Sequence, residues 1–301
     1  MRETSTETEN TGLCRDSTYE LGGSTKFVLD QELAGLPQRN VSEQDTRYPT
    51  DAASMRAFLE VFFTRHLFQL QNSLMDYVTS PDFNETFQLG SLRILDIGSG
   101  PAVASQALTD IVTRTIGDAD SVVSRQYSPF RMIHVLNDTS SICLVTGRRM
   151  LVGYSHAPGQ PCSVAHRLQI FTLPTAFPGN LYQIRDLASS LGNFDLVVLS
   201  YVLHPLTEDG SLQSLVSGLS MLERFCKPRG RVLIVQDRFQ EPLIRKLAGI
   251  IGVECREQML TQRIYPPRGS NETGTYTYYD CLYTPRKRVP STETCDPNLT
   301  R

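Results

Sequence analysis

The feature that most constrains the fold is a glycine turn between an apolar run and a segment of small residues. Residues 93–105 read RILDIGSGPAVAS, so the apolar run ends near Asp96, Gly98 and Gly100 follow, and Pro101 opens the small-residue segment. Proline is favoured in the first turn of a helix, and the pattern therefore predicts a strand, a turn and a helix in succession. Glycines leave the backbone of such a turn open to close approach by a ligand.

From residue 91 onward, short apolar runs alternate with amphipathic segments, as is typical of strands and helices that build a parallel sheet. Strands are expected at 93–98, 130–138, 166–174, 194–203 and 231–237. The fourth is apolar almost throughout and is expected to be central. Pro228 and Gly230 are expected to end the third of four helices, which are placed at 101–117, 140–154, 208–230 and 241–252. An antiparallel hairpin that closes the sheet is expected at 254–265 and 275–283.

The remaining segments suggest a single main domain with appendages. Residues 1–45 are expected to be a flexible leader, 46–90 a helical cap or lid, 91–284 the main domain and 285–301 a polar tail. Within the cap, Thr50 or Asp51 can begin a helix whose apolar residues recur at helical intervals, with a break expected near His66. Two interpretations stay open: a helix packed over the core, or a lid over a substrate pocket.

Composition narrows the classes of function. The formal net charge of -3 provides no overall field to attract nucleic acid or an anionic membrane. The seven cysteines contain no CxxC pair and are odd in number, which favours free thiols in a reducing compartment and no structural metal. The most apolar stretch is interrupted by charges, so no membrane span is expected. We therefore expect a cytoplasmic protein.

Two nucleotide-binding motifs are disfavoured at the glycine turn. A dinucleotide fingerprint would require glycine where Val103 stands, and a phosphate-binding Walker loop would require a following Gly-Lys-Ser/Thr. Instead, LDIGSGPA resembles the first motif, acid-x-Gly-x-Gly-x-Gly, of the class I S-adenosylmethionine (SAM)-dependent methyltransferases, with Ala102 at the third glycine position. The resemblance covers about residues 91–284. It implies a Rossmann-like fold with a seven-stranded, mostly parallel sheet.

The resemblance also implies SAM as cofactor and S-adenosylhomocysteine as product. In this family the glycine turn wraps the methionine part of SAM, and an acid at the end of the second strand binds the ribose hydroxyls. Asp138 stands at that place, with Asn137 as an alternative last strand residue. The third strand ends in FTLPTAF without the acid that often meets the adenine. The cofactor-binding residues are accordingly predicted to be Asp96, Gly98, Ser99, Gly100, Pro101, Asp138 and Ser200.

Three residues near the strand ends are candidates for the chemistry of the acceptor. His204 can serve as a general base, because histidine titrates near neutral pH, or it can be an ordinary loop residue. Tyr201 can bind a substrate or simply pack in the core. Asp237 lies at the ligand-binding edge of the sheet, but it can equally cap the following helix.

The function predicted from the sequence is SAM-dependent methyl transfer to an oxygen or nitrogen nucleophile on a small or modest-sized acceptor. Ala102 and the missing acid leave open a catalytically inactive scaffold that binds a protein or RNA partner. The basic stretches CKPRGR and PRKR leave open an RNA methyltransferase, although nucleic acid is not favoured. An NAD-dependent oxidoreductase is weakened by Val103. The acceptor, the methylated atom and the oligomeric state are left open.

Overall fold

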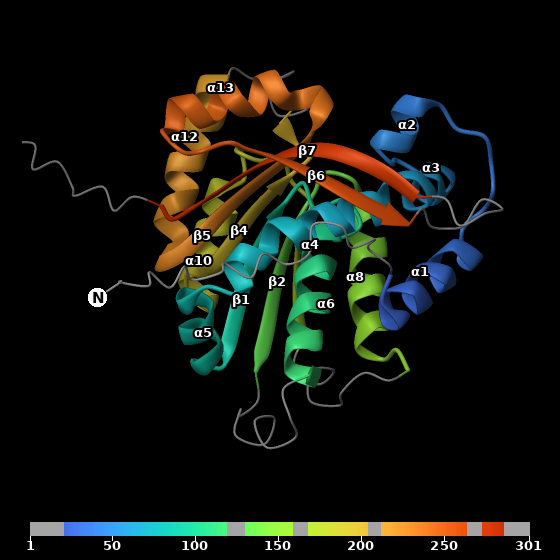
Figure 1. Cartoon of the computed structure of the whole chain (residues 1–301), viewed down its shortest axis with the longest axis horizontal. Coiled ribbons are helices and arrows are strands. Elements are labelled where there is room, and N and C mark those ends of the chain that lie inside the picture. Colours follow the sequence, from blue (N-terminus) through green and yellow to red (C-terminus); the bar gives the residue numbers. More distant parts are fainter. Residues whose placement is uncertain (1–20, 119–129, 159–167, 204–211, 264–272, 286–301) are drawn as a thin grey trace, which may run out of the picture.

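The structure is a computed structural model that describes residues 21–118, 130–158, 168–203, 212–263 and 273–285 (Figure 1). In these ranges seven strands form one sheet in the order β3-β2-β1-β4-β5-β7-β6. Neighbouring strands from β3 to β5 are parallel, whereas β7 is antiparallel to both β5 and β6. The strands are β1 (Ser91–Ile97), β2 (Arg131–Asn137), β3 (Leu168–Leu173), β4 (Phe194–Ser200), β5 (Cys226–Asp237), β6 (Arg256–Arg263) and β7 (Thr273–Tyr283).

This order confirms the predicted fold class: an α/β protein with a seven-stranded, mostly parallel sheet and a C-terminal antiparallel hairpin. It also places the expected central strand, β4, in the middle of the sheet. β1 pairs with β2 on one side and with β4 on the other, so the chain reverses its direction of winding between β1 and β4. Ligands of open α/β sheets bind at such a point, beyond the carboxyl ends of the strands.

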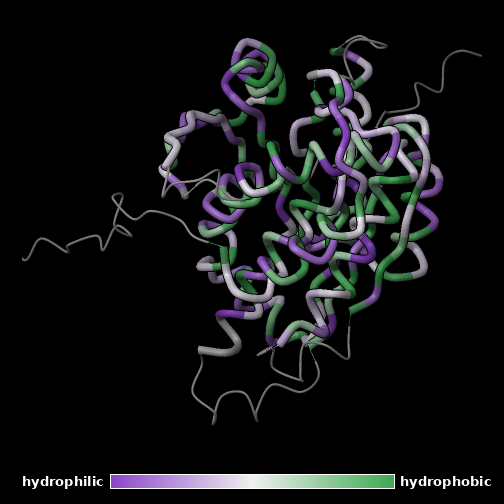
Figure 2. Tube along the Cα trace, turned by 90° about the vertical axis from the view of Figure 1, so that its right-hand side faces the viewer, coloured by the Kyte–Doolittle hydropathy of each residue, from purple (hydrophilic) through white to green (hydrophobic). Residues whose placement is uncertain are grey.

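Helices cover both faces of the sheet (Figure 1). The buried side chains of the sheet form two main hydrophobic clusters with these helices, and hydrophobic residues recur along the trace in Figure 2. One face carries α10 (Leu181–Leu191), α12 (Leu212–Leu222) and α13 (Glu241–Ile251). The other carries α4 (Thr64–Val78), α6 (Val103–Asp118) and α8 (Ser141–Ser155), with α1 (Gly23–Gly35), α2 (Glu43–Arg47), α3 (Ala52–Phe58) and α5 (Pro81–Gln88) around them. Within the described ranges no helix is both long enough and apolar enough to cross a bilayer.

The N-terminal part of the chain is more structured than its composition indicates. α1 lies inside the segment expected to be a flexible leader, yet Val28 and Leu29 are buried in the main hydrophobic cluster. The expected break near His66 is a single π-helical turn, η1 (Leu59–Phe63), between α3 and α4. Such turns inside α-helices are frequent at functional sites. As expected, Asp51 caps α3: its side chain accepts a hydrogen bond from the Ser54 N–H at 2.8 Å.

Several boundaries differ from the sequence predictions. The helix expected from Pro101 begins at Val103, and the helix expected at 208–230 ends at Leu222, followed by the 3-10 turn η2 (Glu223–Phe225). β5 already starts at Cys226. Pro228 and Gly230 therefore do not end a helix but lie within β5, where its pairing with β4 shifts register. A proline cannot donate a ladder hydrogen bond and is tolerated at such an irregularity. Helix α10 was not predicted.

A buried carboxylate joins four helices on the face of α4, α6 and α8. Asp110 on α6 accepts hydrogen bonds from Gln71 on α4 at 2.7 Å, from Tyr154 on α8 at 2.9 Å and from Thr25 on α1 at 3.4 Å. Arg114, one turn later, pairs with the same carboxylate at 2.8 Å. The N-terminal helix is therefore tied to the core by polar contacts as well as by apolar packing.

We predict that Asp110→Ala lowers the free energy of unfolding by about 3–5 kcal/mol, because it leaves several buried donors without their acceptor. Urea denaturation of the full chain measures the effect. Asp186→Ala is the control, since its ion pair with Arg185 is largely exposed and should contribute little. Equal midpoints for the wild type and Asp110→Ala would contradict the prediction.

Candidate functional site

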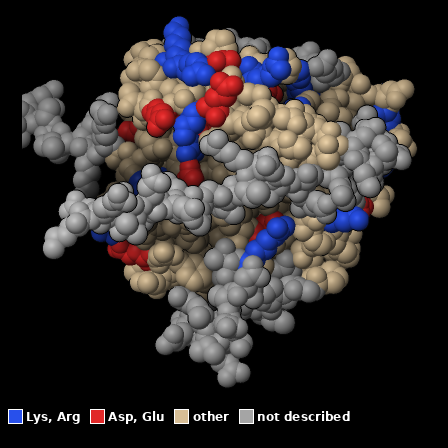
Figure 3. Space-filling view, viewed as in Figure 1, with Lys and Arg blue, Asp and Glu red and all other residues tan. Residues whose placement is uncertain are grey.

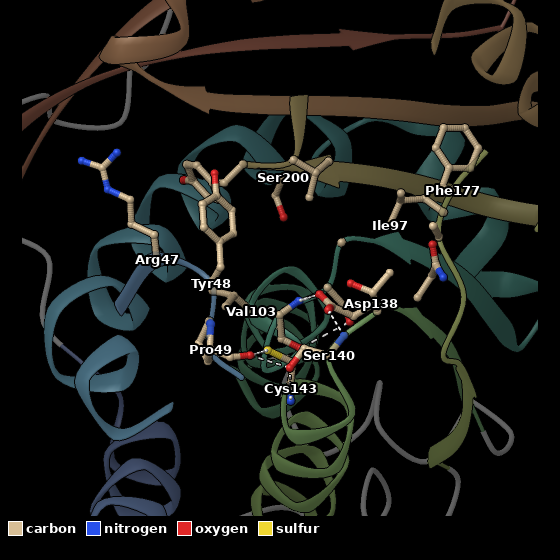
Figure 4. A pocket seen from close by; sticks show the side chains of 18 of the residues that line it. Arg47, Tyr48, Pro49, Ile97, Val103, Asp138, Ser140, Cys143, Phe177 and Ser200 are labelled. Carbon is tan, nitrogen blue, oxygen red and sulfur yellow. Dashed lines mark hydrogen bonds between the residues drawn. The ribbon is translucent and has the colours of Figure 1, made fainter. Parts of the chain in front are cut away.

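A pocket of about 750 Å³ opens at the carboxyl ends of β1, β2 and β4, where the strand order places a ligand site (Figure 4). Its volume lies in the range of small-molecule sites. The glycine turn after β1 and the segment after β2 form one side. The segment 47–50 between α2 and α3, the aromatic residues of α3 to α4, and the loop 175–178 after β3 form the others.

The two glycines of the turn serve different purposes. Both have positive φ, +61° at Gly98 and +51° at Gly100. A Cβ on Gly98 would lie 1.8 Å from Cγ1 of Val202, so this glycine is required by the protein's own packing. A Cβ on Gly100 would approach only Cζ of Phe58, at 4.0 Å, and would otherwise enter the pocket. At Gly100, therefore, the absence of a side chain leaves the backbone open to contact with a ligand in the pocket.

Ala102, at the third position of the motif, is accommodated by a glycine on a different helix. Its φ of +60° places it in the left-handed region, which costs an L-residue about 1–2 kcal/mol. Its Cβ is buried against Gly147 of α8: a Cβ built on Gly147 would lie 2.8 Å from that of Ala102. The departure from glycine thus leaves the turn in place and does not narrow the pocket, which Ala102 does not line.

Asp138 holds the glycine turn from the neighbouring strand. Its Oδ2 accepts a hydrogen bond from the Gly100 N–H at 2.9 Å, and its Oδ1 accepts one from the Ser140 N–H at 2.8 Å. Burial raises the pKa of this carboxyl, and the backbone donors partly oppose that effect. Asn137 is the last residue of β2, but its amide donates to the carbonyls of Leu173 and Thr175. Asp138 is therefore the better placed of the two to bind a ligand.

Asp96 is fully buried and does not line the pocket. Its Oδ2 accepts hydrogen bonds from the N–H of Ser105 at 3.1 Å and from the Ser105 hydroxyl at 2.9 Å, whereas its Oδ1 has no partner among the described residues. Burial raises its pKa to about 7. Pro101 does not line the pocket either. The predicted cofactor residues that do line it are Gly98, Ser99, Gly100, Asp138 and Ser200.

The predicted acceptor-side residues have mixed placements. Tyr201 lines the pocket, but its hydroxyl donates to Oε1 of Gln69 at 2.7 Å, and burial raises its pKa well above the usual value. Asp237 also lines the pocket and caps the short turn η3 (Arg238–Gln240) by accepting the Phe239 N–H at 3.2 Å. His204 lies outside the described residues.

Two parts of the pocket wall were missed by the sequence predictions. One is the segment 47–50, which lies along one side of the pocket and accepts a hydrogen bond at the Pro49 carbonyl from the Ser140 hydroxyl at 2.6 Å (Figure 4). The other is an aromatic group formed by Phe58, Phe62 and His66. The available signal was the four-residue spacing of these three side chains, which places them on one side of a helix.

The basic stretch CKPRGR does not present unpaired cations. Lys227 pairs with buried Asp195 at 2.5 Å, Arg229 pairs with Glu85, and Arg231 pairs with Asp82. Acidic and basic side chains also lie next to each other on the face shown in Figure 3. PRKR lies almost wholly outside the described residues. A phosphate-binding surface at CKPRGR would first have to break these ion pairs.

No protein-family model and no curated protein matches the sequence. Among solved structures, a SAM-dependent methyltransferase from Leishmania major matches with 13% identity and a TM-score of 0.41, over 87% of this chain and 83% of that one. An O-methyltransferase family protein from Burkholderia thailandensis matches with 12% identity and a TM-score of 0.42, over 86% and 70%. The strand order β3-β2-β1-β4-β5-β7-β6, with helices on both faces of the sheet, gives the chain a Rossmann-like fold. Its acceptor is not assigned by these matches.

We predict that Gly98→Ala destabilises the protein by about 2–5 kcal/mol, because the added methyl combines a clash with Val202 and left-handed strain. Val202→Ala removes the atom at 1.8 Å and should recover part of that loss in the double variant. A urea-unfolding cycle of the four proteins measures the coupling. Strictly additive effects would contradict the close contact between these two residues.

We predict that Asp96 makes the protein less stable as pH rises from about 4 to 7. In that window the folded protein keeps the proton on Asp96 while the unfolded chain releases it, so rising pH favours unfolding, by on the order of 4 kcal/mol in total. Asp96→Asn removes this contribution. Urea unfolding of both proteins at pH 5 and pH 8 should show that the variant gains stability relative to the wild type at pH 8. An equal difference at both pH values would refute the prediction.

Proposed function

We propose that this protein is a SAM-dependent methyltransferase that acts on an oxygen or nitrogen nucleophile of a modest-sized acceptor. The observation that carries the proposal is the position of Gly100. Its bare side faces a pocket of about 750 Å³ at the switch point of the sheet, and its N–H is held by Asp138, the acid that follows the neighbouring strand. The segments that the sequence motif brings together thus form one site.

The residues present suit the cofactor. The turn from Gly98 to Gly100 would back its methionine part, and Asp138 would accept hydrogen bonds from its ribose hydroxyls, since each carboxylate oxygen can accept more than one. Bound SAM supplies an electrophilic methyl group. Asp96 ties the start of α6 to the end of β1 through Ser105, behind the turn and outside the pocket lining. The remaining task of the chain is to hold the nucleophile about 3–3.5 Å from the methyl carbon.

The walls of the pocket favour a small acceptor over nucleic acid. Segment 47–50 forms one side of it, and Phe58, Phe62 and Phe177 contribute apolar aromatic surface to its lining. The basic residues of CKPRGR lie at the amino end of β5, at the opposite end of this strand from the pocket, and they pair with acids. We keep the prediction of a cytoplasmic enzyme. An inactive scaffold with the same fold is the rival hypothesis.

Calorimetric titration of the full chain with SAM and with S-adenosylhomocysteine tests the proposal. We predict that the wild type binds both and that Gly100→Ala weakens binding about tenfold or more, since its methyl group enters the pocket beside Phe58. Gly90→Ala is a matched control: Gly90 also has a positive φ, +74°, but its Cβ would meet no described atom within 4 Å and it does not line the pocket.

The control separates two effects of the substitution. Both variants add the same methyl group at a left-handed residue, so their strain is comparable and only Gly100→Ala narrows the pocket. Equal weakening by both variants would assign the loss to strain and contradict the proposed site. No heat of binding with either compound for the wild type would favour the scaffold.

A further inference from the structure

One buried histidine on the pocket wall has a ring nitrogen that the packing of its ring does not require. His66 of α4 is 6% exposed and lines the pocket. Its ring stacks on Tyr201 with a centroid distance of 3.6 Å and an interplanar angle of 13°. Its Nε2 has no hydrogen-bond partner among the described residues. A buried polar atom without a partner costs about 1–3 kcal/mol, and packing alone would be served as well by phenylalanine.

The surroundings of this ring are aromatic. Phe62 lies 5.5 Å from it and Phe58 lies 6.0 Å from it, centroid to centroid. Burial, and then the charge of the adjacent Arg65, lower the pKa of His66 well below its usual value, so the imidazole is neutral at physiological pH. A neutral imidazole recognises a polar group through hydrogen bonds rather than through charge.

A second unpartnered polar atom lies on the same pocket wall. Gln236, near the carboxyl end of β5, is 1% exposed and lines the pocket, and its Nε2 has no hydrogen-bond partner among the described residues. An amide nitrogen is a donor with two hydrogens. Two nearly fully buried polar side chains that line one pocket, one on α4 and one on β5, therefore each have a hydrogen-bonding atom without a partner among the described residues.

This wall adjoins the glycine turn. Phe58, in the aromatic group with His66, is the nearest neighbour of the position that a Cβ on Gly100 would take. Tyr201, which carries the stacked imidazole, directly follows Ser200 at the end of β4, and its own N–H is fixed by the Val235 carbonyl at 2.9 Å. The aromatic wall is thus built on the strand ends beside the site proposed for the methyl donor.

We infer that this wall is the acceptor subsite and that it takes a flat aromatic or heteroaromatic acceptor. The ring packs against Phe58 and Phe62, a ring hydroxyl exchanges a hydrogen bond with Nε2 of His66, and a second oxygen substituent accepts one from Nε2 of Gln236. That the bound molecule is a methyl acceptor rests on the proposed function, whereas the expected binding preference does not depend on the cofactor.

Ligand-observed NMR titration of the full chain tests this preference with four probes. These are 4-hydroxybenzamide, its methyl ether 4-methoxybenzamide, the saturated analogue 4-hydroxycyclohexanecarboxamide, and phenol, which lacks the second oxygen substituent. The wild type should bind the first probe about 3- to 10-fold more tightly than any of the others, since a hydrogen bond and an aromatic contact each contribute to that extent. Titrations with and without S-adenosylhomocysteine are run in parallel.

Variants assign the preference to named atoms. His66→Phe keeps a stacked ring on Tyr201 and should bind the hydroxy and methoxy probes equally, while still preferring both over the saturated one. Gln236→Met should lose its preference for 4-hydroxybenzamide over phenol. Tyr77→Phe is the matched control, because Tyr77 is a buried aromatic residue of the same helix that does not line the pocket, and its probe preferences should stay those of the wild type. Thermal unfolding checks that each variant is folded.

The outcomes separate the two proposals. Binding of S-adenosylhomocysteine without any preference among the probes would overturn the acceptor subsite and leave the proposed function standing. A probe preference that depends on His66, without binding of S-adenosylhomocysteine, would support the aromatic subsite and overturn the proposal that SAM is the cofactor. A preference that persists in His66→Phe would overturn the role of Nε2.

Discussion

The hydrogen bond from the Gly100 N–H to Asp138 is the contact on which the site depends. It joins the turn after β1 to the segment after β2, the two segments that a parallel sheet brings to the same edge. The same carboxylate accepts a hydrogen bond from the Ser140 N–H, and the Ser140 side chain caps α8 and donates to the Pro49 carbonyl at the side of the pocket. One partly buried acid therefore orders the turn and the start of a helix, and through Ser140 the segment 47–50.

The sheet and the glycine turn could be predicted because their signals are local. Apolar runs, glycines and an acid at a strand end lie within a few residues of one another. These local patterns predicted all five parallel strands and the hairpin, with ends that differ from the observed ones by up to about five residues. Gly98, Ser99, Gly100, Asp138 and Ser200 were found in the same way and line one pocket. Their roles with a cofactor stay predictions, as does the division into a leader, a cap, a main domain and a tail.

The remaining features depend on contacts between distant residues. Position 98 must be glycine because Val202 packs directly against it, and the side chain of Ala102 fits because Gly147 has none. No local sequence pattern reveals either of these pairs. His66 enters the site only because the α3–α4 segment packs across the carboxyl ends of β4 and β5, where it meets Tyr201. The helix α1 resembles a leader in composition, but Val28 and Leu29 give it enough apolar surface to pack on the core.

Residues with unfavourable backbone angles and buried polar atoms without partners lie at or next to this pocket. The two described non-glycine residues with positive φ, Ala102 and Tyr201, follow the ends of β1 and β4, and each costs backbone energy that surrounding contacts must offset. Tyr201 is held by its N–H, by the stacked His66 ring and by Gln69. Strained residues and two Nε2 atoms, of His66 and Gln236, that have no partner among the described residues are what the proposed ligand site accounts for. Stability alone would favour phenylalanine at position 66, so the imidazole is best explained by what the pocket binds.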